Sequence, residues 1–132
     1  MEEHARFMPA DERPPSPHPL QLAPLLGDWF NTNQHSRYLV EVRLRERSGT
    51  LYFSGLADGP AGPIAWDEQP ARAYAAGTGL EAGGFTLCYQ RRSIQTHLVA
   101  NQKLGILVIQ SYTSYGDGSG RTPHFSREFY HR

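Results

Sequence analysis

Apolar and polar residues alternate with a period of two along much of the chain. In residues 38–45 (YLVEVRLR) Tyr38, Val40, Val42 and Leu44 alternate with charged side chains at positions 41, 43 and 45. Residues 51–55 (LYFSG) repeat this alternation after the turn residues Ser48 and Gly49. Because successive side chains of a strand point to opposite faces, the two segments predict a β-hairpin.

The rest of the chain predicts short strands joined by turns. Residues 58–70 (DGPAGPIAWDEQP) contain three prolines and predict a long loop, and residues 116–123 (GDGSGRTP) predict a glycine-rich turn. Including the hairpin, eight strands are expected, at residues 27–31, 38–45, 51–55, 71–75, 85–91, 93–100, 104–112 and 124–131.

Eight sequential antiparallel strands predict an all-β fold, an up-and-down barrel. Closure of the sheet removes the exposed edges that an open sheet would present. A barrel of this size has room inside for side chains or for one small ligand. Residues 1–20 hold five prolines and predict a flexible Pro-rich N-terminal tail, so that the barrel domain spans residues 21–132.

Composition excludes several kinds of partner. The 132 residues include 13 basic and 13 acidic ones, so no net field would attract nucleic acid or an anionic membrane. No apolar run approaches the roughly 20 residues that a membrane helix needs. The N-terminal residues MEEHARFMPADERPP lack the apolar segment of a signal peptide, which predicts a cytoplasmic protein.

Motifs for cofactors and metals are absent from the sequence. The single cysteine, Cys88, excludes an internal disulfide and a cysteine zinc cage, and we interpret it as a small buried hydrophobic residue. None of the six histidines is paired with another at metal-ligand spacing. The glycines of residues 116–121 join two strands, whereas a phosphate loop leads into a helix. We therefore expect no metal and no cofactor.

The opening of the first strand carries a family resemblance. Gly27 and Trp29 form a Gly-x-Trp motif that resembles the calycin superfamily, which includes lipocalins, fatty-acid-binding proteins and avidins. The resemblance implies that Trp29 plugs the closed end of the barrel and that an arginine from the last strand packs across its indole. Arg127 is the better placed candidate, and Arg132 is the other. The segments GDWFNTN and FSREFY also resemble small bacterial proteins, a likeness that lends a fold and no chemistry.

A calycin-like barrel implies a small apolar or aromatic ligand held in the cavity. Arg127 lies between Phe125 and Phe129, so its guanidinium needs a partner, for which Trp29, Gln110 or an acidic ligand would serve. The candidate wall residues are Tyr38, Val40, Val42, Phe53, Leu87, Tyr89, Leu98, Val108, Tyr112 and Arg127.

Two other functions stay open. The first is a cofactor-free cyclase or isomerase acting on a polyene or polyketide-like molecule, with Tyr112, His97, Tyr89 and Gln110 as donors. Alternation places His97 on the outer face, and only the reverse facing would bring it into the cavity. The second is a barrel filled by side chains that binds a partner protein on its surface. A homodimer is also allowed. An open interior favours a carrier or an enzyme, and a filled interior favours the interaction module.

Overall fold

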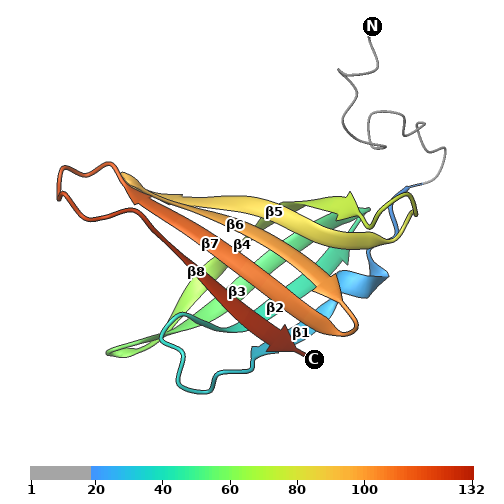
Figure 1. Ribbon diagram of the computed structural model, residues 1–132, viewed down its shortest axis with the longest axis horizontal. Coiled ribbons are helices and arrows are strands. Elements are labelled where there is room, and N and C mark those ends of the chain that lie inside the picture. The colour runs from blue at the N-terminus through green and yellow to red at the C-terminus, as the bar shows by residue number, and fades with distance from the viewer. Residues whose placement is uncertain (1–18) are drawn as a thin grey trace, which may run out of the picture.

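The computed structural model describes residues 19–132, which form one closed barrel (Figure 1). Each strand pairs antiparallel with the next, and β8 returns to pair with β1. A short 3-10 helix, η3 (Ala23–Leu25), precedes the barrel. The strands are β1 (Gly27–Asn31), β2 (Leu39–Arg47), β3 (Thr50–Gly59), β4 (Gly62–Ala75), β5 (Ala82–Arg91), β6 (Ile94–Lys103), β7 (Ile106–Tyr115) and β8 (His124–His131). The predicted eight-stranded up-and-down barrel is therefore confirmed, while residues 1–18 of the predicted tail lie outside the described residues.

The predicted loop at residues 58–70 is wrong, because most of it belongs to β4. Pro63 lies opposite Asp58 of β3, and Pro70 lies opposite Tyr52. The strand tolerates both prolines because β5 pairs only with residues 72–75 of β4, so the earlier half of β4 has a neighbour on one side alone. The long β3–β4 hairpin extends one wall of the barrel toward its left-hand end in Figure 1.

A bulge interrupts β4 beside Trp66. Phe53 lies opposite Gln69 and Gly55 lies opposite Trp66, so Asp67 and Glu68 together face the single residue between Phe53 and Gly55. Because β4 has one extra residue at this point, side chains both before and after the bulge can face the barrel interior. Trp66 is thereby turned toward the barrel interior.

The right-hand end of the barrel in Figure 1 is packed solid. Trp29 is fully buried there, and its indole Nε1 donates a 2.9 Å hydrogen bond to the carbonyl of Leu25 in η3. The backbone of Gln21 pairs with Leu80 and Ala82, which ties the segment before η3 to the start of β5. The largest fully buried side chains are Trp29, Tyr130, Phe53, Phe85, Leu25, Leu39, Leu44, Leu51, Leu98, Leu107, Ile109 and Val42.

The arginine on the Trp29 indole is Arg132, which corrects the expected Arg127. The guanidinium carbon of Arg132 lies 4.2 Å from the ring centroid of Trp29. Side chains of β8 alternate, and buried Tyr130 shows that the even positions face inward. Arg132 continues that inward parity, whereas Arg127 has the opposite parity and lies beside Gln110 on the outer face.

Within residues 19–132, no helix has both the length and the apolar character needed to cross a membrane.

Candidate functional site

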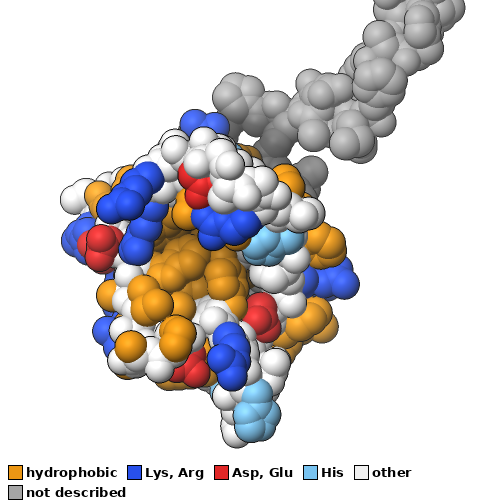
Figure 2. All heavy atoms as spheres, turned by 90° about the vertical axis from the view of Figure 1, so that its left-hand side faces the viewer, with side chains coloured by type: hydrophobic (Ala, Val, Ile, Leu, Met, Phe, Trp, Pro, Cys, Tyr) orange, Lys and Arg blue, Asp and Glu red, His pale blue; other side chains and the backbone are white. Residues whose placement is uncertain are grey.

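The left-hand end of the barrel in Figure 1 is open, in contrast to the packed end. Figure 2 looks into this end and shows a hollow with an apolar floor, ringed by basic, acidic and histidine side chains. The connections β1–β2, β3–β4, β5–β6 and β7–β8 surround the hollow, because they all join strands at this end of an up-and-down barrel. The open end is therefore where a ligand can enter.

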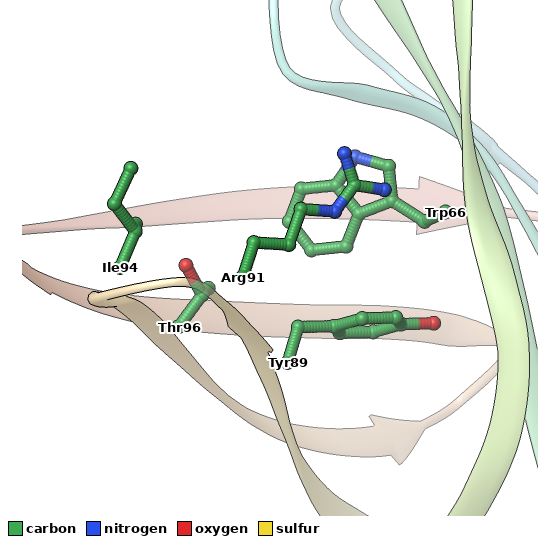
Figure 3. Close-up of a pocket in the computed structure, with 5 residues that line it drawn as sticks. All are labelled: Trp66, Tyr89, Arg91, Ile94 and Thr96. Carbon is green, nitrogen blue, oxygen red and sulfur yellow. The ribbon is translucent and has the colours of Figure 1, made fainter.

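A pocket of about 170 Å³ lies inside the open end (Figure 3). Trp66 of β4, Tyr89 and Arg91 of β5, and Ile94 and Thr96 of β6 line it. An apolar cavity of about 150 Å³ accepts a benzene-sized molecule. The pocket thus has room for the ring of a small molecule, and its open side leaves space for a substituent.

Aromatic rings connect this pocket with the barrel core. The ring of Trp66 lies 4.9 Å from that of Tyr89 at an angle of 72°, and 5.4 Å from that of Tyr38 at 90°. Phe53 continues the series, with ring centroids 6.1 Å from Tyr89 and 5.8 Å from Phe85. Such edge-to-face pairs hold their rings in fixed orientations, so the apolar wall is formed before any ligand arrives.

Hydrogen bonds fix the polar atoms of this wall. The Tyr89 hydroxyl donates a 2.6 Å hydrogen bond to the carbonyl of Asp67 in the β4 bulge. Burial raises the pKa of Tyr89 far above its ordinary value, and the nearby Asp67 carboxylate adds to this effect. The Thr96 hydroxyl lies 3.1 Å from that of Thr113. Tyr89 is therefore a neutral hydrogen-bonded wall residue at neutral pH.

Polar side chains cover the opposite wall of the barrel. The Ser36 hydroxyl donates a 2.6 Å hydrogen bond to the Glu128 carboxylate. The hydroxyls of Tyr38 and Ser111 are both buried and have no hydrogen-bond partner within residues 19–132. Burial raises the pKa of Tyr38, although the neighbouring Ser111 hydroxyl partly opposes this effect. The interior therefore combines an aromatic wall with a wall rich in hydroxyl groups.

Several predicted wall residues face the interior, but few of them lie at the pocket. Tyr89 lines it directly, and Tyr38 and Phe53 pack against its aromatic wall. Val42, Leu87 and Leu98 are buried in the core below. Val40 lies at the register shift between Leu39 and Glu41 and does not line the pocket.

The other predicted residues lie on the outer face of β6, β7 and β8. Tyr112 is 46% exposed, stacks on Phe125 and accepts a 2.9 Å hydrogen bond from Gln110. His97 lies opposite Tyr112, as the alternation of its strand predicts. The remaining members of this outer set are Val108 and Arg127. Of the four predicted donors, Tyr89 alone lines the pocket.

Cys88 also lies on the outer face, half-buried, which corrects the expectation of a buried core residue. Its sulfur is 3.9 Å from Nε2 of His97, its partner across β5 and β6.

Sequence reasoning missed Trp66 and Arg91 as pocket residues. Trp66 was assigned to a loop because three prolines surround it. Arg91 has the same parity in β5 as Leu87 and Tyr89, so the period of two places it inward, and its charge obscured this signal. The inward facing of Ile94 and Thr96 likewise follows directly from the period of two in β6.

Comparison of this chain with protein-family models, curated proteins and solved structures finds no match. Within residues 19–132, no group of three or more His, Cys, Asp or Glu side chains is arranged to hold a metal ion. The function must therefore be inferred from the geometry of the open end.

Proposed function

We propose that this protein binds a small, flat, largely apolar molecule in the open end of the barrel. The observation that carries the proposal is the pocket between Trp66 and Tyr89, whose two rings stand at 72° to one another and leave about 170 Å³ between strands β4, β5 and β6. A concave apolar site with a few polar groups is the usual form of a small-molecule site.

The expected affinity is modest. Burial of about 150–200 Å² of apolar ligand surface contributes about 4–5 kcal/mol at about 25 cal/mol per Å². Contacts with the aromatic wall add to this, and the loss of ligand freedom opposes it. A binding free energy of about 4–5 kcal/mol corresponds to dissociation constants of about 0.2–1 mM.

The closed barrel and the Trp29–Arg132 contact are calycin-like, and the open hollow supports a carrier over a barrel filled by side chains. This likeness is one of architecture, and the expected cytoplasmic location stays a prediction. The cyclase or isomerase alternative receives less support, because Tyr112, His97 and Gln110 lie outside the barrel. An enzyme in this barrel would have to rely on Tyr89 and the hydroxyl-rich wall.

Tryptophan fluorescence tests the proposal, because the two tryptophans lie in different environments. Trp29 is fully buried at the packed end and Trp66 lies at the pocket. We would titrate the protein with naphthalene, indole and biphenyl derivatives, and map the site by NMR. Saturable quenching that disappears in Trp66→Phe, with shifts at Tyr89, Ile94 and Thr96, is the expected result.

Matched variants locate the binding site. Ile94→Phe fills the pocket from β6 and should weaken binding, whereas Tyr112→Ala removes an aromatic ring from the outer face and should leave binding unchanged. The proposal would be overturned if none of the aromatic ring systems bound, or if the NMR shifts were confined to Tyr112 and Phe125.

A further inference from the structure

We infer that the ligand is an acid whose carboxylate pairs with Arg91 at the mouth of the pocket. This inference rests on the proposed function, because it specifies the chemistry of the molecule bound there. The flat part of the ligand would lie against Trp66 and Tyr89, and its carboxylate would point toward the open end.

Among residues 19–132, Arg91 is the only charged residue that lines the pocket. It is the last residue of β5, so its backbone stands at the rim, and its side chain reaches toward the Ala65 carbonyl in β4. In Figure 3 the Arg91 side chain extends toward the side of the pocket where Trp66 lies, in agreement with its contact with the Ala65 carbonyl. A ligand ring in this pocket would therefore have a guanidinium group at one end.

The guanidinium of Arg91 has no acidic partner within residues 19–132. Its one hydrogen bond runs from Nη2 to the carbonyl of Ala65 at 3.5 Å, the long limit for such a contact. Arg121, in the β7–β8 connection at the same end, is by contrast paired with Asp117 at 2.6 Å. Arg91 thus keeps donors available for a ligand.

The chemistry of a guanidinium group selects a planar anion. Its fork of N–H donors matches the two oxygens of a carboxylate, which form two parallel charge-assisted hydrogen bonds. A cationic ligand would meet a like charge at the pocket mouth, and a neutral amide would gain weaker hydrogen bonds. Electrostatics at the rim therefore favours an aromatic or polyene acid over the neutral analogue of the same shape.

Acid and amide probes with the same ring system test the inference. We would measure the binding of 2-naphthoate and 2-naphthamide by calorimetry at low and high salt. Exposed ion pairs contribute up to about 1 kcal/mol, so the acid should bind up to about fivefold more tightly. The advantage should shrink at high salt because mobile ions screen the rim charge.

Two arginine variants identify the group responsible. Arg91→Gln should abolish the preference, so that the acid and the amide bind about equally. Arg92→Gln removes the neighbouring charge, which lies in the β5–β6 turn and does not line the pocket, and should keep the preference. Both positions are exposed, so neither change should disturb folding.

The outcomes separate the inference from the proposed function. Equal binding of acid and amide by the unmodified protein overturns the inference and leaves the aromatic site intact. A preference that survives Arg91→Gln, or that disappears in Arg92→Gln, overturns the assignment to Arg91. If neither probe binds, and no indole or biphenyl derivative binds either, both the proposed function and the inference are overturned.

Discussion

The guanidinium carbon of Arg132 lies 4.2 Å from the ring centroid of Trp29, and Nη1 of the same arginine donates a 2.9 Å hydrogen bond to the carbonyl of Leu26. Trp29 in turn donates from Nε1 to the carbonyl of Leu25. One arginine and one tryptophan therefore satisfy two neighbouring carbonyl groups where η3 leads into β1, and they seal the packed end of the barrel.

Replacement of Arg132 by alanine should destabilise the protein by about 1–2 kcal/mol. The variant loses a cation–π contact, which contributes about 0.5–2 kcal/mol, and a charge-assisted hydrogen bond to Leu26. Arg132→Lys should retain part of this stabilisation. Arg127→Ala is the control, because Arg127 lies on the outer face, and it should change the free energy of unfolding by less than about 0.5 kcal/mol. Urea denaturation measures all three, and equal losses for Arg132→Ala and Arg127→Ala would contradict the assignment.

Replacement of Gly27 by alanine should destabilise the same end by more than about 1 kcal/mol. Gly27 has φ of +130°, a conformation that strains any residue with a side chain. An added Cβ would also lie 3.2 Å from Cδ of Arg132, a tight contact that the arginine side chain would have to relieve by shifting slightly. Gly79→Ala is the matched control, since the nearest atom to its added Cβ lies 3.6 Å away at ordinary contact distance. The prediction fails if thermal unfolding shows the two variants to be equally stable.

Three of the seven tyrosines should ionise only when the barrel unfolds. Burial raises the pKa of Tyr38, Tyr89 and Tyr130, and the Tyr130 hydroxyl also donates a 2.9 Å hydrogen bond to the carbonyl of Leu39. A raised pKa in the folded state gives stability that is complete below the unfolded value of about 10 and is lost as the pH rises above it. Absorbance at 295 nm, followed together with circular dichroism, should show their ionisation coinciding with unfolding. Ionisation of all seven while the barrel stays folded would contradict the burial of these hydroxyls.

The β7–β8 connection should keep its order until the solution is strongly acidic. Hydrogen bonds from the side chain and backbone N–H of Ser119, together with the Arg121 guanidinium, lower the pKa of Asp117 to about 2. A lowered pKa gives stability that is present above the usual value of about 4 and is lost as the pH falls toward 2. Carboxyl NMR should show this depressed titration, and Ser119→Ala should move it upward. Titration of Asp117 near pH 4 in the unmodified protein would show that the connection is not held in this way.

The barrel could be predicted from sequence because its hairpins carry a clear period of two. The faces of β6 followed from that period, and His97 lies outside as expected. The same reasoning could not recover β4, because proline usually marks a break and the one-sided pairing of this strand is a tertiary property. It also missed the bulge that turns Trp66 inward, since an extra residue shifts the parity without leaving a local signal.

The last strand illustrates a different limit. Hydrophobicity favoured an inward facing for Phe125 and Phe129, yet these rings are 61% and 45% exposed. The strand instead turns Glu128 inward, where it accepts the Ser36 hydrogen bond, and Tyr130, where it donates to Leu39. Hydrogen bonds across the barrel therefore outweighed the apolar character of two phenylalanines in setting which side chains of β8 face inward.

The two ends of the barrel have different roles. The residues that hold the fold together, from Leu25 to the Trp29 indole, gather at one end, while the rings and the guanidinium that would recognise a guest gather at the other. Exchange of Arg91 or Ile94 can therefore alter selectivity with little penalty to folding. A barrel divided in this way can change the ligand that it binds and keep its fold, so it offers a convenient starting point for the redesign of a binding protein.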